Sequence, residues 1–436
     1  MADKNIKWLL NELTSWSNEG LVDVSTADRI RKYYESQPSL RKKWALVAFS
    51  ILGSLLIGAG VILLLAHNWT DLSLSQRSVL SFAPLVISQC LAGWVLLKRR
   101  DGAAWREGAG IAVTLSIGAC IALVSQTYHI PGSFDQFMLI WMLLALPVIY
   151  LLNSSVSAAI YLAGIISWAG YVQFHHGQVP IVWLLIAAIV PHLWLSIRRN
   201  RYDVRSSFLL WAFCIGLCIV TGIALEKNLP GLWIPVYASL FASMYLAGRL
   251  YFNEVPSFWQ RPLVIVGSWG TVVLSWMLTF NWPWKDIGWR FYRERWGYFE
   301  NAAIADYCLL SILLILSAVL IARAIAGQER SGLFFGALPA VTVVGYAVTA
   351  AYRYDTLAVV LMNAFFVCAG VGLIGSGVKS TKLSRLNGGM LIVGAFIVSR
   401  FFDTDFDMFV RGIIFIALGA MFLVANVVMI RKKGRA

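Results

Sequence analysis

The sequence predicts an all-α integral membrane protein with about fourteen membrane-crossing helices, and it is also compatible with twelve or thirteen. Of its 436 residues, 59% are hydrophobic and 13% are charged, whereas a soluble domain has roughly 45–50% apolar and ~25% charged residues. The mean hydropathy is +0.71. Apolar runs of close to the ~20 residues that cross a hydrocarbon core recur along the chain. In lipid, each run must bond its own backbone groups, which favours helices.

The first 43 residues are more polar than the rest and predict a short cytoplasmic helical hairpin. A helix is expected over about 6–17, where Trp8, Leu9 and Leu13 recur at helical spacing, and Gly20 can end it in a left-handed cap. The Ser25–Asp28 segment resembles a capping box that opens a second helix to about residue 35. So small a hairpin buries little core by itself. It is expected to pack on the membrane domain, on a partner copy or on lipid headgroups.

From residue 44 onward the chain alternates between apolar spans and short polar connections. The thirteenth span is short, and the fourth and fifth are nearly fused, so the number of spans is the weaker part of the prediction. The expected spans cover residues 44–66, 77–97, 107–125, 135–152, 155–173, 179–197, 206–225, 230–249, 261–281, 303–325, 333–351, 355–377, 386–400 and 409–430.

The distribution of basic residues predicts the orientation. With the N-terminus inside, the inside segments hold 27 of the 36 Lys and Arg residues. Such a bias over short loops is the positive-inside pattern, and it places both termini in the cytoplasm. The net charge of +14 does not indicate nucleic-acid binding, because the basic residues lie between apolar runs and no basic soluble domain is present.

One outside connection, residues 281–301, breaks this trend with four basic residues and eight aromatic ones, in the sequence NWPWKDIGWRFYRERWGYFEN. Two interpretations remain open. The aromatic side chains, which include Trp282 and Trp284, suit a segment at headgroup level. Alternatively, aromatic faces and Arg side chains could form a platform for a glycan or a lipid headgroup.

Polar groups at membrane depth are costly, so each is a candidate site. Gln89 lies in the middle of the second span and Asn363 in the middle of the twelfth. For both, the alternative to a binding site is a hydrogen bond between helices. In the sixth span, His192 follows Pro191, and this proline should kink the helix.

Two polar clusters lie at outer helix ends, one after the first span and one at the end of the third. If the first and third helices are neighbours, their side chains could line one external pocket that binds a substrate. The alternative is helix capping and interfacial anchoring. The clusters consist of His67, Asn68 and Trp69, and of Gln126, Tyr128 and His129.

The sequence predicts no cofactor, no metal site and no catalytic residue. Cys214 and Cys218 share a helix face, which could be half of a soft-metal site, but two small hydrophobic residues are the simpler interpretation. The acidic turn at residues 403–407 lacks the glycine and glutamate of an EF-hand. There is no nucleophile elbow, Walker loop or HExxH motif. Gly372 and Ser376, spaced by four, are typical of close helix packing.

Several segments resemble a known family. The sequences LNELTSWSNEGLVDVSTADRI, ILGSLLIGAGVILLLAHNW and LVSQTYHIPGSFDQFMLIWMLLALPVIYLL, in this order, are similar to the bacterial predicted membrane protein family called domain of unknown function 2157. The resemblance covers about residues 5–190, and the last helices resemble related uncharacterised membrane proteins. It implies a multi-pass protein of the bacterial inner membrane but no activity. It also raises interest in Asn68, Trp69, Gln126 and Tyr128, which match the family's pattern.

These observations divide the chain into three parts: the hairpin 1–43, a membrane domain of the family over 44–200, and a C-terminal membrane domain over 201–436. The leading hypothesis for function is a transporter or a lipid- or glycan-handling permease. The alternative is a membrane scaffold or sensor that binds a partner copy or another membrane protein through residues 1–43. An intramembrane enzyme has the least support. Membrane lipids are the other expected partners.

Overall fold

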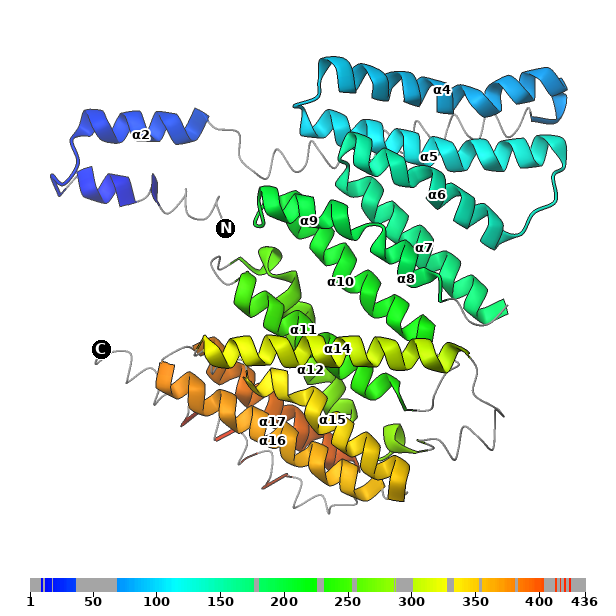
Figure 1. The fold of residues 1–436 in the computed structure, drawn as a ribbon. Coiled ribbons are helices and arrows are strands. Elements are labelled where there is room, and N and C mark those ends of the chain that lie inside the picture. The colour runs from blue at the N-terminus through cyan, green and yellow to red at the C-terminus, as the bar shows by residue number, and fades with distance from the viewer. Residues whose placement is uncertain are drawn as a thin grey trace. The chain divides into compact units, whose positions relative to one another are not determined.

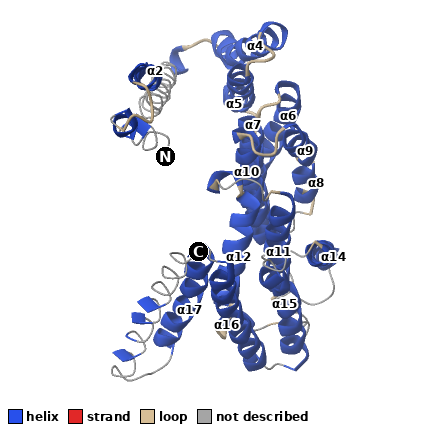
Figure 2. Cartoon of the chain, turned by 90° about the vertical axis from the view of Figure 1, so that its left-hand side faces the viewer, coloured by secondary structure: helices blue, strands red, loops and turns tan. Residues whose placement is uncertain are grey.

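The structure is a computed structural model, and every regular element in its described residues is a helix (Figure 2). By length and composition, nine helices in this part of the chain are long and apolar enough to cross a membrane, so the protein is a multi-pass membrane protein. The total of about fourteen spans stays a prediction. The described residues are 9–10, 12–17, 19–36, 69–175, 180–225, 231–252, 257–285, 287, 301–327, 333–352, 355–380, 383–403 and single positions between 412 and 424.

The predicted first span and most of the fourteenth lie outside the described residues, as do His67 and Asn68. The chain divides into two compact units, Met1–Leu80 and Ser81–Ala436. The predicted domain boundaries after residues 43 and 200 stay predictions.

In the first unit, residues 12–17 are helical and are followed by Gly20, whose φ of 72° is the left-handed conformation expected of it. Helix α2 (Val24–Ser36) comes next. The Arg31 Nη2 atom of α2 donates a hydrogen bond to Thr14 Oγ1 over 3.0 Å, which ties the two helical segments together. The short helix η1 (Trp69–Asp71) precedes α4.

The predicted capping box was placed wrongly, because α2 starts one residue before Ser25. The Asp23 carbonyl accepts the backbone N–H groups of Thr26 and Ala27, each over 2.9 Å. The Ser25 hydroxyl turns back to the Asp23 carboxylate over 2.5 Å. This hydrogen bond is the main cause that lowers the pKa of Asp23, and backbone N–H groups of the first turn add to it. An ionised Asp23 therefore fits the start of α2.

From residue 74 to residue 403 each predicted span falls on a helix or, for the sixth, on two short helices (Figure 1). The fourth and fifth spans are separate, because Asn153 adopts a left-handed conformation with φ 49° between them. The helices are α4 (Leu74–Lys98), α5 (Ala103–Tyr128), α6 (Phe134–Leu152), α7 (Ser155–His175), α8 (Val182–Ala187), α9 (Val190–Arg199), α10 (Val204–Leu225), α11 (Trp233–Tyr251), η2 (Phe258–Gln260), α12 (Pro262–Met277), η3 (Trp282–Trp284), α14 (Asn301–Ala326), α15 (Leu333–Tyr352), α16 (Asp355–Ser380) and α17 (Leu383–Asp403).

Within the second unit, α5 to α10 form a group around α7. Helix α7 packs against α5, α6 and α10. Its buried face carries Tyr161, Ile165 and Trp168, which lie in one core with Met142 of α6 and Leu209 of α10. Because α7 is the shared neighbour, this first group positions side chains from α5 and α10 on either end of one central helix.

Helices α11 to α17 form a second group in which small residues allow close approach. Helix α11 packs on α12, α14 and α15, and α16 packs on α15 and α17. A Cβ atom at Gly267 of α12 would lie 2.4 Å from the backbone N of Tyr245 in α11. One at Gly377 of α16 would lie 2.5 Å from the backbone N of Leu386 in α17. Where lipid offers no hydrophobic drive, such close packing holds helices together.

Trp284 corrects the interfacial interpretation of the aromatic connection. Its side chain is 1% exposed in the core of the second group, and its indole N–H donates to the Leu278 carbonyl over 2.9 Å. The absence of a side chain at Gly345 makes room for the ring. Trp282, two residues earlier, is 56% exposed as an interfacial residue would be. The rest of the predicted aromatic segment, apart from Lys285 and Ile287, is outside the described residues.

Candidate functional site

The sixth span is kinked near Pro191, as predicted, and α8 and α9 are separated by a short break at which Ala188 and Ile189 keep right-handed helical angles. Helix α8 ends at Ala187 and α9 begins at Val190. The Ile189 N–H bonds to the Ile186 carbonyl, three residues back, in place of the carbonyl four residues back. Proline has no N–H and crowds the preceding turn, so it cannot continue the helical hydrogen-bond ladder.

Two tyrosines satisfy backbone carbonyls at the break. The Tyr161 hydroxyl of α7 donates to the Leu185 carbonyl over 2.9 Å, and the Tyr150 hydroxyl of α6 donates to the Ala188 carbonyl. An irregular backbone at membrane depth is tolerated only where protein or a water-lined cavity supplies its hydrogen bonds. The break is therefore part of the fold, and hydroxyl groups of two neighbouring helices satisfy its carbonyls.

His192 lies one residue after the proline and is buried, with 3% of its surface exposed. The Tyr150 ring meets the imidazole edge-on, with 5.8 Å between centroids. Within the described part of the chain, His192 Nε2 has no hydrogen-bond partner. The charged groups that act on His192 are Arg205, Glu107 and Arg199. A polar atom without a partner is costly inside a protein, so this position is a candidate for a ligand or proton contact.

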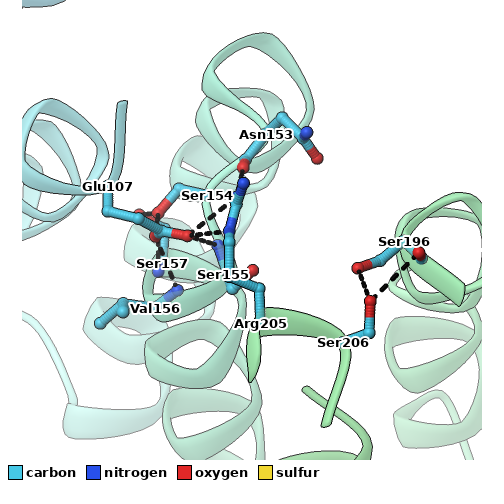
Figure 3. A network of polar contacts seen from close by, with 9 residues as sticks. All are labelled: Glu107, Asn153, Ser154, Ser155, Val156, Ser157, Ser196, Arg205 and Ser206. Carbon is cyan, nitrogen blue, oxygen red and sulfur yellow. Dashed lines mark hydrogen bonds and ion pairs between the residues drawn. The ribbon is translucent and has the colours of Figure 1, made fainter. Parts of the chain in front are cut away.

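Glu107, near the start of α5, holds the N-terminus of α7 (Figure 3). Its carboxylate accepts the N–H of Ser155 over 2.9 Å and that of Val156 over 3.1 Å. It also accepts the Ser154 hydroxyl over 2.6 Å. A carboxylate at a helix N-terminus satisfies free N–H groups and the positive end of the helix dipole.

Arg205 of α10 completes this network from the other side, as Figure 3 shows. Its Nη2 lies 2.9 Å from Glu107 Oε1 in an ion pair, its Nε donates to the same oxygen over 3.0 Å, and Nη2 also donates to the Asn153 carbonyl. The two side chains are 25% and 17% exposed. The polar network thus joins α5, the α6–α7 turn and α10.

The network lies where three connections meet: residues 99–102, 153–154 and 200–203. The charge pattern had predicted that these three connections lie on one side of the membrane, and the structure brings them to one end of the first group. Next to it, the Ser206 hydroxyl of α10 bonds Ser196 of α9 over 2.8 Å. The end of α9 is therefore fixed to the same place.

Removing two charges from water costs several kcal/mol per ion, so a partly buried ion pair is by itself weak evidence of stability. Its role here is geometric, because it fixes α5, the α6–α7 turn and α10 relative to one another. The pair lies at the end of a group that also contains the kinked sixth span.

The residues predicted from sequence do not form one site in the described structure. Gln126, Tyr128 and His129 share the end of α5 and are exposed. His129 has φ 51°, and its N–H closes the helix on the Ser125 carbonyl, which is the capping role considered as the alternative. Trp69 is in the first unit, and its predicted neighbours His67 and Asn68 are not described.

Gln89 and Asn363 have different surroundings. Gln89 is exposed in the middle of α4. Asn363 makes the interhelical hydrogen bonds considered as its alternative role: its Nδ2 donates to the Thr279 carbonyl over 3.3 Å, and its Oδ1 accepts Arg400 Nη2 over 2.9 Å. Arg400 also lies 5.2 Å from the centroid of the Phe280 ring. Asn363 thus links α16 to α17 and to the segment after α12.

Sequence reasoning missed Glu107, Arg205 and Arg400. Glu107 is the first residue of the predicted span 107–125, and Arg205 is the last residue before the span 206–225. A charged residue at a span boundary is normally assigned to the headgroup region. The sequence did offer one indication, which is that each of these charged residues adjoins an apolar span. Among the described residues, no group of three or more His, Cys, Asp or Glu could hold a metal ion, so Cys214 and Cys218 find no further ligands of these types there.

The fold and this site define a multi-pass α-helical membrane protein with a kinked helix beside a partly buried ion pair. Residues 14–158 match the family described as Predicted membrane protein (DUF2157). This confirms the resemblance, over about a third of the chain. The match contains Glu107 and ends near the start of α7, so His192 and Arg205 lie beyond it. No curated protein and no solved structure matches the chain.

Proposed function

We propose that the protein is a membrane transporter or a lipid- or glycan-handling permease that works through the first helix group. The break between α8 and α9 carries this proposal. Discontinuous membrane helices are the usual place where transporters bind substrate, because the freed backbone groups and half-helix ends offer polar contacts at membrane depth. The His192 Nε2 atom, which has no hydrogen-bond partner among the described residues, is the contact that this break offers.

The Glu107–Arg205 ion pair holds the helices of this group in one arrangement. It joins α5 to α10, and both helices pack on α7. Separating the charges would leave each without its partner, so opening this end is expected only when a ligand or solvent replaces the lost contacts. The ion pair therefore favours one arrangement of these helices, and separating it costs free energy.

The proposed location is the bacterial inner membrane, with both termini in the cytoplasm and the ion pair at the cytoplasmic end. The Lys and Arg side chains in the segments 98–106 and 198–205 support this orientation. A fluorescent or protease-cleavable tag at either terminus should be reached only from the cytoplasm. A tag that reacts only in the periplasm would overturn the orientation.

A ligand screen tests the function. Purified full-length protein would be heated with a broad panel of envelope precursors, and hits would be carried into proteoliposome uptake. We expect at least one compound to raise the melting temperature and to cross the membrane, and the effect to be lost in His192→Ala but kept in Gln89→Ala. Neither stabilisation nor uptake across the panel would overturn the proposal. An effect that persists in His192→Ala but is lost in Gln126→Ala would move the site to the outer end of α5.

The second candidate is a scaffold or sensor that binds through the N-terminal segment. One observation favours it: residues Met1–Leu80 are a compact unit separate from the rest, and the apolar Leu21 and Val24 are exposed on it. Deleting residues 1–40 should then abolish a complex seen in native detergent extracts while membrane insertion persists. Equal migration with and without the deletion would exclude this role.

A further inference from the structure

The exposed face of α9 changes from apolar to basic along its length. Val190, Trp194 and Arg198 are spaced by four residues and so lie on one side of the helix. Val190 is 43% exposed and Trp194 is 53% exposed, and Arg198 is also exposed. Over about 12 Å of helix rise, this face thus passes from a hydrocarbon-like residue to a tryptophan and then to a cation.

The tryptophan and the arginine form one unit. The guanidinium carbon of Arg198 lies 4.9 Å from the centroid of the Trp194 ring. The ring face attracts the cation and holds it at the end of the helix. Tryptophan prefers the boundary between hydrocarbon and headgroups, so the guanidinium is held where a lipid phosphate would lie.

Two neighbouring arginines already have partners in the protein. Arg205 pairs with Glu107, and Arg201 donates to the Tyr251 carbonyl over 2.7 Å. For Arg198 and Arg199, no hydrogen bond or ion pair occurs among the described contacts. Asp203 is the carboxylate in this connection, and the surrounding arginines outnumber it. Two guanidinium groups without anionic partners complement a phosphodiester, which accepts several N–H groups at once.

We propose that this α9 face, formed by Val190, Trp194 and Arg198, binds an anionic phospholipid, with Arg199, the next residue at the end of the helix, as a second cation. Its acyl chain lies along Val190, its glycerol region meets Trp194, and its phosphate accepts hydrogen bonds from Arg198 and Arg199. The proposal concerns the outer face of α9 and does not depend on the transport function.

Native mass spectrometry of the detergent-purified full chain tests it with two probes, dioleoylphosphatidylglycerol and dioleoylphosphatidylcholine. We expect the anionic lipid to be retained more strongly. The variant R198Q/R199Q should weaken its binding by about fivefold per arginine, the scale of one basic residue near an anionic surface. Trp194→Leu should weaken it less, and Arg198→Lys should retain most of the binding because the charge is kept.

The matched control is R99Q/R100Q, which removes two exposed arginines from the α4–α5 connection at the same end of the group. We expect it to change binding by less than about twofold. An equal loss in both double variants would overturn the site in favour of diffuse basic charge. Equal retention of the two lipids would overturn headgroup recognition. Displacement of the anionic lipid by a soluble polyglutamate peptide would replace the lipid with an acidic protein partner.

Discussion

The two helix groups of the second unit differ in the main contacts that hold their helices together. The first, α5 to α10, contains a broken helix, two tyrosine hydroxyls that satisfy its carbonyls, and an ion pair between α5 and α10. The second, α11 to α17, relies mainly on glycines that let helix backbones approach and on the buried Trp284, with the Asn363–Arg400 hydrogen bond as a polar link. Polar contacts that can be exchanged are suited to motion, whereas close-packed surfaces resist it. The comparison is the reason why we propose function for the first group and expect rigidity of the second.

The largest expected effect tests the packing of the second group. Trp284→Ala removes a fully buried indole and leaves a cavity, which should lower the free energy of unfolding by about 4 kcal/mol. Trp282→Ala is the matched control, since that side chain is 56% exposed. Thermal denaturation in detergent compares the two. Equal losses would restore the interfacial interpretation for both tryptophans.

The next effect tests the first group. Glu107→Ala leaves the Arg205 guanidinium and the N–H groups of Ser155 and Val156 without their acceptor, so we expect a loss of about 3 kcal/mol. The reversed pair E107R/R205E should not restore stability, because an arginine at position 107 cannot accept those N–H groups. Recovery in the reversed pair, measured by the same denaturation, would mean that charge attraction alone holds the helices.

A smaller effect comes from close helix approach in the second group. Gly377→Ala places a Cβ 2.5 Å from the Leu386 backbone N and should cost about 2 kcal/mol. Gly375→Ala, two residues earlier in α16, meets nothing within 4 Å. Alanine there should be neutral or stabilise the helix by up to ~1 kcal/mol. Similar melting temperatures for the two variants would contradict the proposed α16–α17 contact.

The smallest effect concerns the break. Tyr161→Phe removes the hydroxyl that satisfies the Leu185 carbonyl and should destabilise the protein by about 1 kcal/mol. The control is Tyr352→Phe in the second group, where the side chain is 71% exposed. If the break is a ligand contact, Tyr161→Phe should also weaken the ligand-dependent rise in melting temperature. Unchanged stability in both variants would show that water serves the carbonyl equally well.

Much of the fold could be predicted because the relevant forces act locally. The spans from residue 77 to residue 400 coincide with helices, and Pro191 was expected to distort the sixth. The candidate site could not be predicted in the same way. Glu107 and Arg205 are 98 positions apart, and each looks like an ordinary boundary charge. Asn363 was singled out as a polar residue in the middle of a span, but its partner Arg400 was not.

The sequence by itself determined that the chain is built of membrane helices and where most of those in the described residues begin and end. It could do so because apolar length is read along the chain and helical hydrogen bonds join residues four apart. The tertiary structure alone decided which helices are neighbours, that Trp284 is buried, and that Glu107 meets Arg205. Lipid is as apolar as a leucine side chain, so the hydrophobic pattern does not mark which face of a helix meets another helix.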